Sequence, residues 1–303
     1  MGAGLLLVAL VGLPGNAPAD DKGLSIGYFV DRENEADPDT IRDRLEQWLR
    51  KVSGSNSLDE VSATVESNHR KWSSAVQSGE YDLHGLYSYQ YLELEDDRIM
   101  RPALATTDTH GITSTFLLIT RRQDQLTSID SLRDKKILVD TGGFGELPMI
   151  WLATKLASAT EPENVPDFAD VVAVQNPIRA LLPVYFGKAD ACVITRSAFK
   201  DANSLNSELI TKLHSITNSK PLLVSLVAFR KDFPNVEAAK IVSLAVKGST
   251  QTEFANLFEQ LGRKGLVEID DSALLTVRAL HQNYRQIFAS EKSERTVKEA
   301  PER

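Results

Sequence analysis

The stretch that most constrains the fold of this chain is ILVDTGGFGELPMIWLATKL, residues 137–156. It begins with a short β-branched segment, passes through Gly142, Gly143 and Gly145, and continues with apolar residues at helical spacing. A strand, a glycine turn and a helix in this order are typical of an α/β sheet. Such a turn points backbone N–H groups outward at a helix N-terminus, where the macrodipole favours an anion. We therefore predict an α/β fold with a loop suited to an anion.

Two common nucleotide-binding loops do not fit this stretch. No Lys-Ser or Lys-Thr follows the glycines, as a phosphate-gripping P-loop requires, and Pro148 stands where the dinucleotide fingerprint needs its third glycine. One remaining alternative is a loop that contacts a ligand, and the other is a tight turn that only leads into a packed helix. Under the first alternative, the ligand contacts are Thr141, Gly142, Gly143 and Phe144.

Length and composition indicate a soluble protein of two lobes. The 303 residues exceed a typical domain of ~100 to 200 residues. With 34 Lys and Arg against 42 Asp and Glu, the net charge is −8, which argues against nucleic acid or an anionic membrane surface as the main partner. The hydrophobic fraction of 42% and charged fraction of 25% are typical of globular proteins.

The N-terminal residues 1–19 resemble a secretory signal. Residues 5–13, LLLVALVGL, are too short to span a bilayer, which takes ~20 residues, but suit a signal core. Ala17-Pro18-Ala19 provides a cleavage pattern before Asp20, although no Lys or Arg precedes the apolar run. We expect a periplasmic protein, membrane-anchored if the true N-terminus lies upstream; the alternative is a buried N-terminal element. The single Cys192 cannot form an internal disulfide and suits a core position.

Strands and helices alternate along the rest of the chain in a β-α-β-α-β order. Strands are predicted at 24–31, 61–65, 82–86, 113–120, 137–140, 170–174, 189–194 and 221–229. Helices are predicted from Pro38, around 72–76, after the glycine loop, and at 178–186, 236–246, 252–261 and 271–288. The first helix has its apolar residues on one face: Ile41, Leu45, Trp48, Leu49 and Val52. Residues 290–303 are charged and aperiodic, so we expect a disordered tail. Because no linker separates two halves, we expect the chain to cross between lobes more than once.

Five strings in this order resemble the periplasmic phosphate/phosphonate-binding component of ABC importers. They are SIGYFVD at 25–31, GEYDLHGLYSYQYL at 79–92, TSTFLLITRRQDQLTSIDSLRDKKI at 113–137, FGKADACVITRSAF at 186–199 and SKPLLVSLVAFRKDFP at 219–234. No single string is specific, but their order is that of the family, and the resemblance covers residues 24–281.

The resemblance implies an α/β, two-lobe type 2 periplasmic-binding-protein clamshell with open sheets and two crossover strands. Lobe one would comprise residues 20–112 and 226–289, and lobe two residues 113–225, with crossover strands at 113–120 and 222–229. A monomer of this kind holds a small ligand between its lobes and delivers it to a membrane permease. It is not an enzyme and carries no cofactor.

The chain departs from the family pattern at the positions that grip the oxyanion. Thr141-Gly142-Gly143-Phe144 replaces a Ser-Thr-Ser-Gly run, Ile178 replaces a histidine, and Thr195-Arg196 replaces an Asp-Ser pair. The family implies a small anionic ligand of phosphonate or phosphate type. The two glycines in place of hydroxyls would make room for something bulkier.

Further candidate ligand contacts lie at the ends of the predicted strands. Tyr28 lies in the second half of the first predicted strand, and Tyr87, Ser88 and Tyr89 follow the strand at 82–86; their polar tips could bind a ligand or simply pack. Ser114 and Thr115 begin the first crossover strand, where the alternative is plain β-propensity. Thr195 and Arg196 end another strand, and Arg196 could bind an oxyanion or be a surface residue.

Other kinds of chemistry find no support in the sequence. The five histidines show no metal-binding spacing, and no G-x-S-x-G nucleophile motif occurs. With the signal-like start and the two-lobe pattern, the resemblance implies an exported solute-binding protein, and we expect no metal. Two alternatives stay open, a ligand-sensing periplasmic subunit for a signalling partner and an enzyme of similar lobe architecture.

Overall fold

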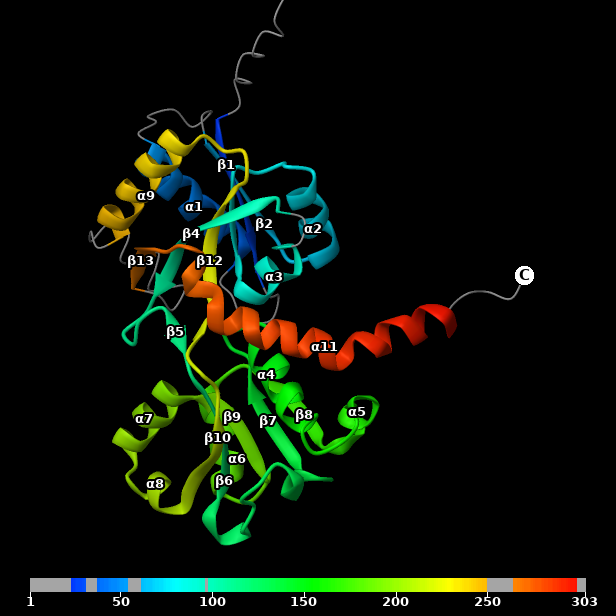
Figure 1. Ribbon diagram of the computed structural model, residues 1–303. Helices are drawn as coiled ribbons and strands as arrows, with labels where there is room; N and C mark the ends of the chain where they lie inside the picture. The colour runs from blue at the N-terminus through cyan, green and yellow to red at the C-terminus, as the bar shows by residue number, and fades with distance from the viewer. Residues whose placement is uncertain (1–22, 31–36, 54–60, 96–97, 250–263, 299–303) are drawn as a thin grey trace, which may run out of the picture.

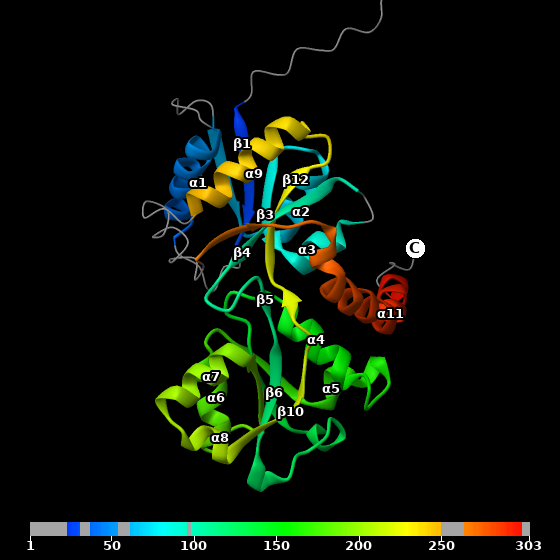
Figure 2. The same cartoon turned by 60° about the vertical axis from the view of Figure 1, so that its left-hand side comes forward.

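The computed structural model describes residues 23–30, 37–53, 61–95, 98–249 and 264–298. They form two lobes that are stacked end to end and joined at a narrow waist (Figures 1 and 2). The signal-like segment 1–19 and the helix predicted at 252–261 lie outside the described residues.

The first lobe is built on a six-stranded sheet with the order β13-β4-β12-β3-β1-β2. Its strands are β1 (Leu24–Phe29), β2 (Val61–Glu66), β3 (Leu83–Tyr87), β4 (Met100–Thr107), β12 (Ser225–Arg230) and β13 (Gly265–Glu268). Strand β1 runs parallel to β2 and β3, whereas β12 runs antiparallel to both β3 and β4. The helices of this lobe are α1 (Pro38–Ser53), α2 (His69–Gln77), α3 (Ser88–Glu93) and α9 (Asn235–Ser249).

The second lobe is built on a five-stranded sheet with the order β10-β6-β9-β7-β8. Its strands are β6 (Phe116–Arg121), β7 (Lys136–Asp140), β8 (Asp170–Val174), β9 (Ala191–Thr195) and β10 (Leu213–Asn218). Its helices are α4 (Leu147–Leu156), α5 (Val165–Phe168), α6 (Pro177–Tyr185), α7 (Arg196–Leu205) and α8 (Glu208–Lys212). Two open mixed sheets flanked by helices confirm the predicted α/β fold class.

Two short strands connect the lobes. Strand β5 (Thr113–Ser114) leads into lobe two and pairs antiparallel with β11 (Leu222–Leu223), which leads back into lobe one. Each predicted crossover strand is thus interrupted, at Thr115 and at Val224, where the chain leaves the short pair to join a lobe sheet. The waist is a two-stranded hinge.

Helix α1 buries the face that its sequence predicts and is capped at its N-terminus. All five residues of its predicted apolar face are buried. At its start, the Asp37 carboxylate accepts a hydrogen bond from the Thr40 N–H at 3.0 Å, which satisfies one of the unpaired donors of the first turn. The helix therefore begins and packs where its sequence predicts.

The C-terminal helix α11 (Leu275–Lys298) crosses the waist and contacts both lobes (Figure 1). It packs on α3 of lobe one and on α4 of lobe two. Arg278 forms ion pairs with Glu95 at 2.5 Å and with Asp271 at 2.7 Å. Residues 290–298, which we expected to lie in a disordered tail, continue this helix.

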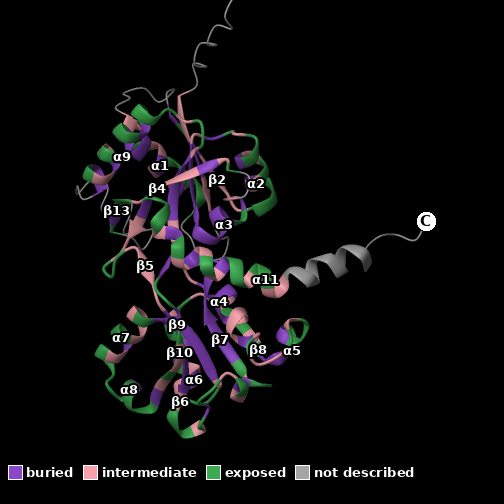
Figure 3. Ribbon diagram, viewed as in Figure 1, coloured by how far each residue is buried: buried purple, intermediate pink, exposed green. Residues whose placement is uncertain are grey.

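The buried apolar side chains of the described residues form three clusters, and one of them joins the lobes. Figure 3 shows buried residues along the strands of both sheets. The first cluster lies under α1 and α9, and the second lies under α6 in lobe two. The third, which we call the interlobe cluster, includes Tyr87 and Tyr89 of lobe one, Phe116 and Trp151 of lobe two, and Val277 of α11. The lobes therefore meet through buried apolar side chains.

Candidate ligand site between the lobes

The glycine loop of lobe two lies against a pair of tyrosines of lobe one. The rings of Tyr87 and Tyr89 stack with centroids 5.8 Å apart and planes 13° apart. A Cβ added to Gly145 would lie 3.0 Å from atoms of both rings. Two features that the sequence placed at separate strand ends thus meet across the waist.

The three glycines of the loop meet different requirements. Gly143 and Gly145 have φ angles of +72° and +55°, in the left-handed region that side chains other than glycine rarely adopt. Gly142 has ordinary φ, but a Cβ there would lie 2.6 Å from the carbonyl oxygen of Gln175. The loop therefore needs glycine for its backbone shape at two positions and for space at the third.

Most of the loop N–H groups that suggested an anion site already have partners within the protein. The Thr141 N–H donates to the Val174 carbonyl at 2.9 Å, and the Phe144 N–H donates to the Thr141 carbonyl at 3.0 Å. The Gly142 N–H donates to the Asp140 carboxylate at 3.1 Å. The Thr141 hydroxyl bonds the side chain of Gln175 at 3.2 Å. In this conformation the loop is an internally bonded turn that offers few free donors.

Asp140, which the sequence analysis did not select, is the most unusual polar residue of the site. It ends β7, is only 3% exposed, and no Lys, Arg or His of the described residues pairs with it. Burial raises the pKa of its carboxyl group to about 6, against the lowering effect of the Gly142 N–H. The available signal was an aspartate directly after an apolar strand, which we interpreted only as the strand end.

Four predicted residues lie around the start of β6. The Arg196 N–H donates to the Thr115 carbonyl at 2.8 Å, and the Arg196 side chain is exposed. The Thr195 hydroxyl caps α7, because it accepts a hydrogen bond from the Ala198 N–H at 3.2 Å. Ser114 is half-buried in the hinge. The backbone contact between Arg196 and Thr115 thus places these four residues beside one another at the waist.

Two predicted residues have structural contacts away from this corner. The Tyr28 ring lies where a Cβ of Gly85 would be, and it packs against the core cluster under α1. Ser88 is fully buried, and its hydroxyl donates to the Leu223 carbonyl at 2.7 Å. Ser88 thus connects α3 to the hinge.

Aromatic rings extend from the loop into lobe two. Phe144 meets Phe116 edge to face, with ring centroids 5.5 Å apart. The centroid of the Phe116 ring also lies 6.2 Å from that of Trp151. With the tyrosine pair, these rings pack into one apolar, aromatic cluster between the lobes.

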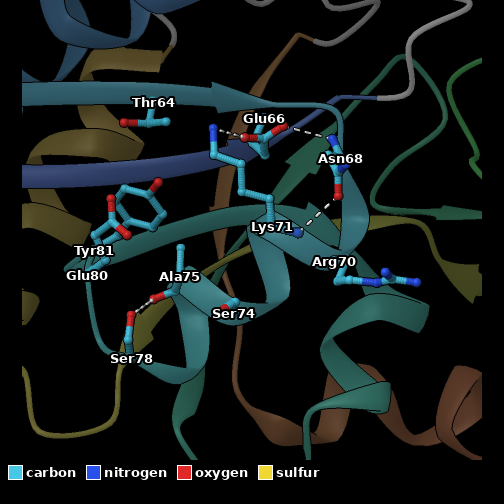
Figure 4. A pocket seen from close by; sticks show the side chains of 10 residues that line it. All are labelled: Thr64, Glu66, Asn68, Arg70, Lys71, Ser74, Ala75, Ser78, Glu80 and Tyr81. Atoms are coloured by element: carbon cyan, nitrogen blue, oxygen red, sulfur yellow. Dashed lines mark hydrogen bonds and ion pairs between the residues drawn. The ribbon is translucent and has the colours of Figure 1, made fainter.

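A separate hollow of about 520 Å³ lies on lobe one between β2 and α2 (Figure 4). None of the predicted site residues lines it. Glu66 in its wall accepts hydrogen bonds from Lys71 at 2.7 Å and from the Asn68 N–H at 2.8 Å. Although burial favours the neutral form, Lys71 and the N–H donors lower the pKa of Glu66. The wall residues are thus paired with one another, which is typical of a capped helix start.

The described residues contain neither a metal-binding group nor a membrane-spanning helix. No three His, Cys, Asp or Glu side chains among them gather closely enough to hold a metal ion. In the same part of the chain, no helix combines the length and the apolar character needed to cross a bilayer.

Comparison with protein families identifies one match over most of the chain. Residues 30–274 match the family described as "ABC transporter, phosphonate, periplasmic substrate-binding protein". No curated protein matches the chain in sequence.

Several solved structures share the two-lobe fold at low sequence identity. XAC2383 from Xanthomonas citri bound to ATP has a TM-score of 0.62 at 11% identity, covering 88% of this chain and 98% of that one. The binding component of an ABC phosphonate transporter from Pseudomonas aeruginosa has a TM-score of 0.59 at 14% identity, covering 89% of each chain. PhnD1 from Prochlorococcus marinus in complex with methylphosphonate has a TM-score of 0.57 at 11% identity, covering 90% and 99%. At these identities the likeness shows the fold alone, and it confirms the predicted two-lobe clamshell.

Proposed function

Since the chain belongs to the family of periplasmic substrate-binding proteins of phosphonate ABC transporters, we propose that it captures an organic phosphonate or phosphate between its lobes. Proteins of this family bind a small ligand and deliver it to the permease of an ABC importer; their role is binding rather than catalysis.

The observation that carries the proposal is the contact of Gly145 with Tyr87 and Tyr89. It joins the loop after β7 to the end of β3, and open α/β sheets bind ligands at the carboxyl ends of their strands. Because Gly145 has no side chain, the loop of lobe two can lie directly against the tyrosine pair of lobe one when the lobes close. A ligand held here would separate or bridge the two surfaces, so its binding would be coupled to lobe movement.

The proposed ligand combines an oxyanion with an apolar or ring-shaped body. The stacked tyrosines and Phe144 can receive an apolar or flat group, and the exposed Arg196 with the hydroxyls of Ser114 and Thr115 can receive the oxyanion. ATP in XAC2383 and methylphosphonate in PhnD1 both carry such an oxyanion, which supports this chemistry for a shared fold.

We further infer that the protein works as an exported monomer without a cofactor. The family is periplasmic, which agrees with the signal-like start of the sequence. A sensory role for the same binding event would require a signalling partner in place of the permease. Co-purification with one or the other membrane partner distinguishes these roles.

Titration calorimetry with methylphosphonate, inorganic phosphate and ATP, together with small-angle scattering, tests the proposal. At least one of the phosphorus compounds should bind, and the radius of gyration should change on binding. Tyr89→Ala should weaken binding by roughly 5- to 150-fold, because the loss of an aromatic contact costs ~1–3 kcal/mol. Tyr185→Ala, which removes an aromatic residue on lobe two away from the waist, should leave the affinity unchanged. Binding of neutral compounds only would refute the oxyanion part of the proposal.

A further inference from the structure

The buried carboxylate of Asp140 raises a question about any oxyanion that binds beside it. One carboxylate oxygen accepts the Gly142 N–H at 3.1 Å, and the other accepts no hydrogen bond from a described residue. An ionised carboxylate can only accept hydrogen bonds, so a second anion without a proton meets both repulsion and a missing donor. A buried charge with so few partners is costly unless something neutralises it or donates to it.

The surroundings of Asp140 do not supply that partner. Strand β7 is flanked by β8 and β9, and α4 and α6 pack on it. From these elements the one other titratable group that interacts with Asp140 is the thiol of Cys192 on β9, and burial, with Asp140 as a smaller cause, raises the pKa of that thiol. The thiol is neutral and fully buried. No described cation offsets the charge of Asp140.

We propose that Asp140 selects oxyanions that carry a proton and rejects oxyanions that cannot. The free carboxylate oxygen would accept a hydrogen bond from the P–OH group of a singly protonated phosphonate or phosphate. A sulfonate or sulfate has no such proton near neutral pH and would face the carboxylate without a donor. This inference rests on the proposed function, because it concerns the specificity of the same site.

The pH dependence of binding follows from the same geometry. A phosphonate or phosphate monoester loses its second proton near neutral pH. Above that pH the ligand has no donor for Asp140, so its affinity for the wild-type protein should fall as the pH rises from 6 to 8.5. Below it, either the ligand or Asp140 itself carries the proton that the contact needs.

Calorimetric titrations of methylphosphonate and methanesulfonate at pH 6.5 provide the test. The wild-type protein should prefer methylphosphonate by roughly 10- to 100-fold, since a hydrogen bond to a charged group is worth ~1.5–3 kcal/mol. Asp140→Asn keeps the shape and an acceptor for the Gly142 N–H, and its amide can donate to either oxyanion. It should therefore reduce the preference to less than about threefold and remove the fall in affinity at high pH.

Asp170→Asn is the matched control, because Asp170 is an exposed aspartate at the far end of the neighbouring strand β8. It should keep the wild-type preference. If Asp140→Asn also keeps it, the role of Asp140 is refuted while the proposed function stands. If the wild-type protein binds the two compounds equally, or its affinity for methylphosphonate does not fall with rising pH, the inference is refuted without any variant. If it binds no phosphorus oxyanion, both proposals fail.

Discussion

We expect the protein to become less stable in mild acid, because the buried His84 resists protonation. Replacing His84 with leucine should remove this acid-induced loss of stability. His84 lies in β3 with no exposed surface, and neither ring nitrogen has a hydrogen-bond partner among the described residues. Its nearest aromatic neighbour is Tyr81, with ring centroids 6.1 Å apart. Burial, with a smaller effect of the Arg230 charge, lowers the pKa of His84 from 6.5 to about 4.

The size of the effect follows from the two pKa values. The unfolded chain takes up a proton at His84 near pH 6.5, whereas the folded chain does so only near pH 4, so stability falls between these values as the pH decreases. One pH unit in this window corresponds to ~1.4 kcal/mol, which gives a loss of ~2 kcal/mol at pH 5. The raised pKa of Asp140, about 6, acts the other way, because the folded chain binds that proton first. Its contribution between pH 7 and pH 5 is a gain of ~1 kcal/mol.

Urea unfolding followed by circular dichroism at pH 7, 6 and 5 measures this balance. The wild-type protein should lose ~1 kcal/mol between pH 7 and pH 5, whereas His84→Leu should gain ~1 kcal/mol over the same range. The matched control is His110→Leu, which replaces an exposed histidine near the hinge and should follow the wild-type slope. If His84→Leu loses as much stability in acid as the wild-type protein, the assignment of the acid sensitivity to His84 is wrong.

Three further predictions test the packing of the waist. Gly145→Ala should lower the free energy of unfolding by ~1 kcal/mol more than Gly143→Ala, because both have positive φ but only the Cβ of the first would touch the tyrosine pair; equal losses in thermal melts would contradict this. Arg278→Met should lower the free energy of unfolding by ~1–2 kcal/mol, because the ion pair with Glu95 is lost. If the effects of Arg278→Met and Glu95→Gln simply add in the double variant, the two residues are not coupled. Trp151→Ala, at a site 3% exposed, should cost ~3–5 kcal/mol, and a loss below ~1 kcal/mol would mean that the interlobe cluster contributes little.

Elements with a strong local pattern could be predicted from the sequence. The apolar face of α1 and the strand, glycine turn and helix around β7 and α4 depend on residues close together in the chain. Strands β4, β10 and β13 were not predicted. Strand β4 contains Arg101 and Pro102 and pairs only with β12 and β13, which lie far along the chain. Its strand character therefore depends on partners that a local pattern does not reveal.

The same limit applies to the candidate site. Residue types and strand ends suggested Tyr87, Tyr89 and the glycine loop, and the structure brings them together. The sequence could not show that the hydroxyl of Thr195 caps a helix or that the hydroxyl of Ser88 bonds the hinge, because these partners are set by the fold. The ligand contacts of the site residues stay predictions.

The position of β12 also determines the order in which the lobes can be completed during synthesis. Strand β12 lies between β3 and β4, yet it is made long after both, whereas the five strands of lobe two all come from one continuous stretch. As the chain leaves the ribosome, lobe two has all its strands while the first sheet still has two open edges where β12 will insert. Open strand edges attract other chains, so we expect the nascent protein to need protection until residues 225–230 emerge. We expect a chain truncated at residue 224 to keep the protease resistance of lobe two and to lose that of lobe one.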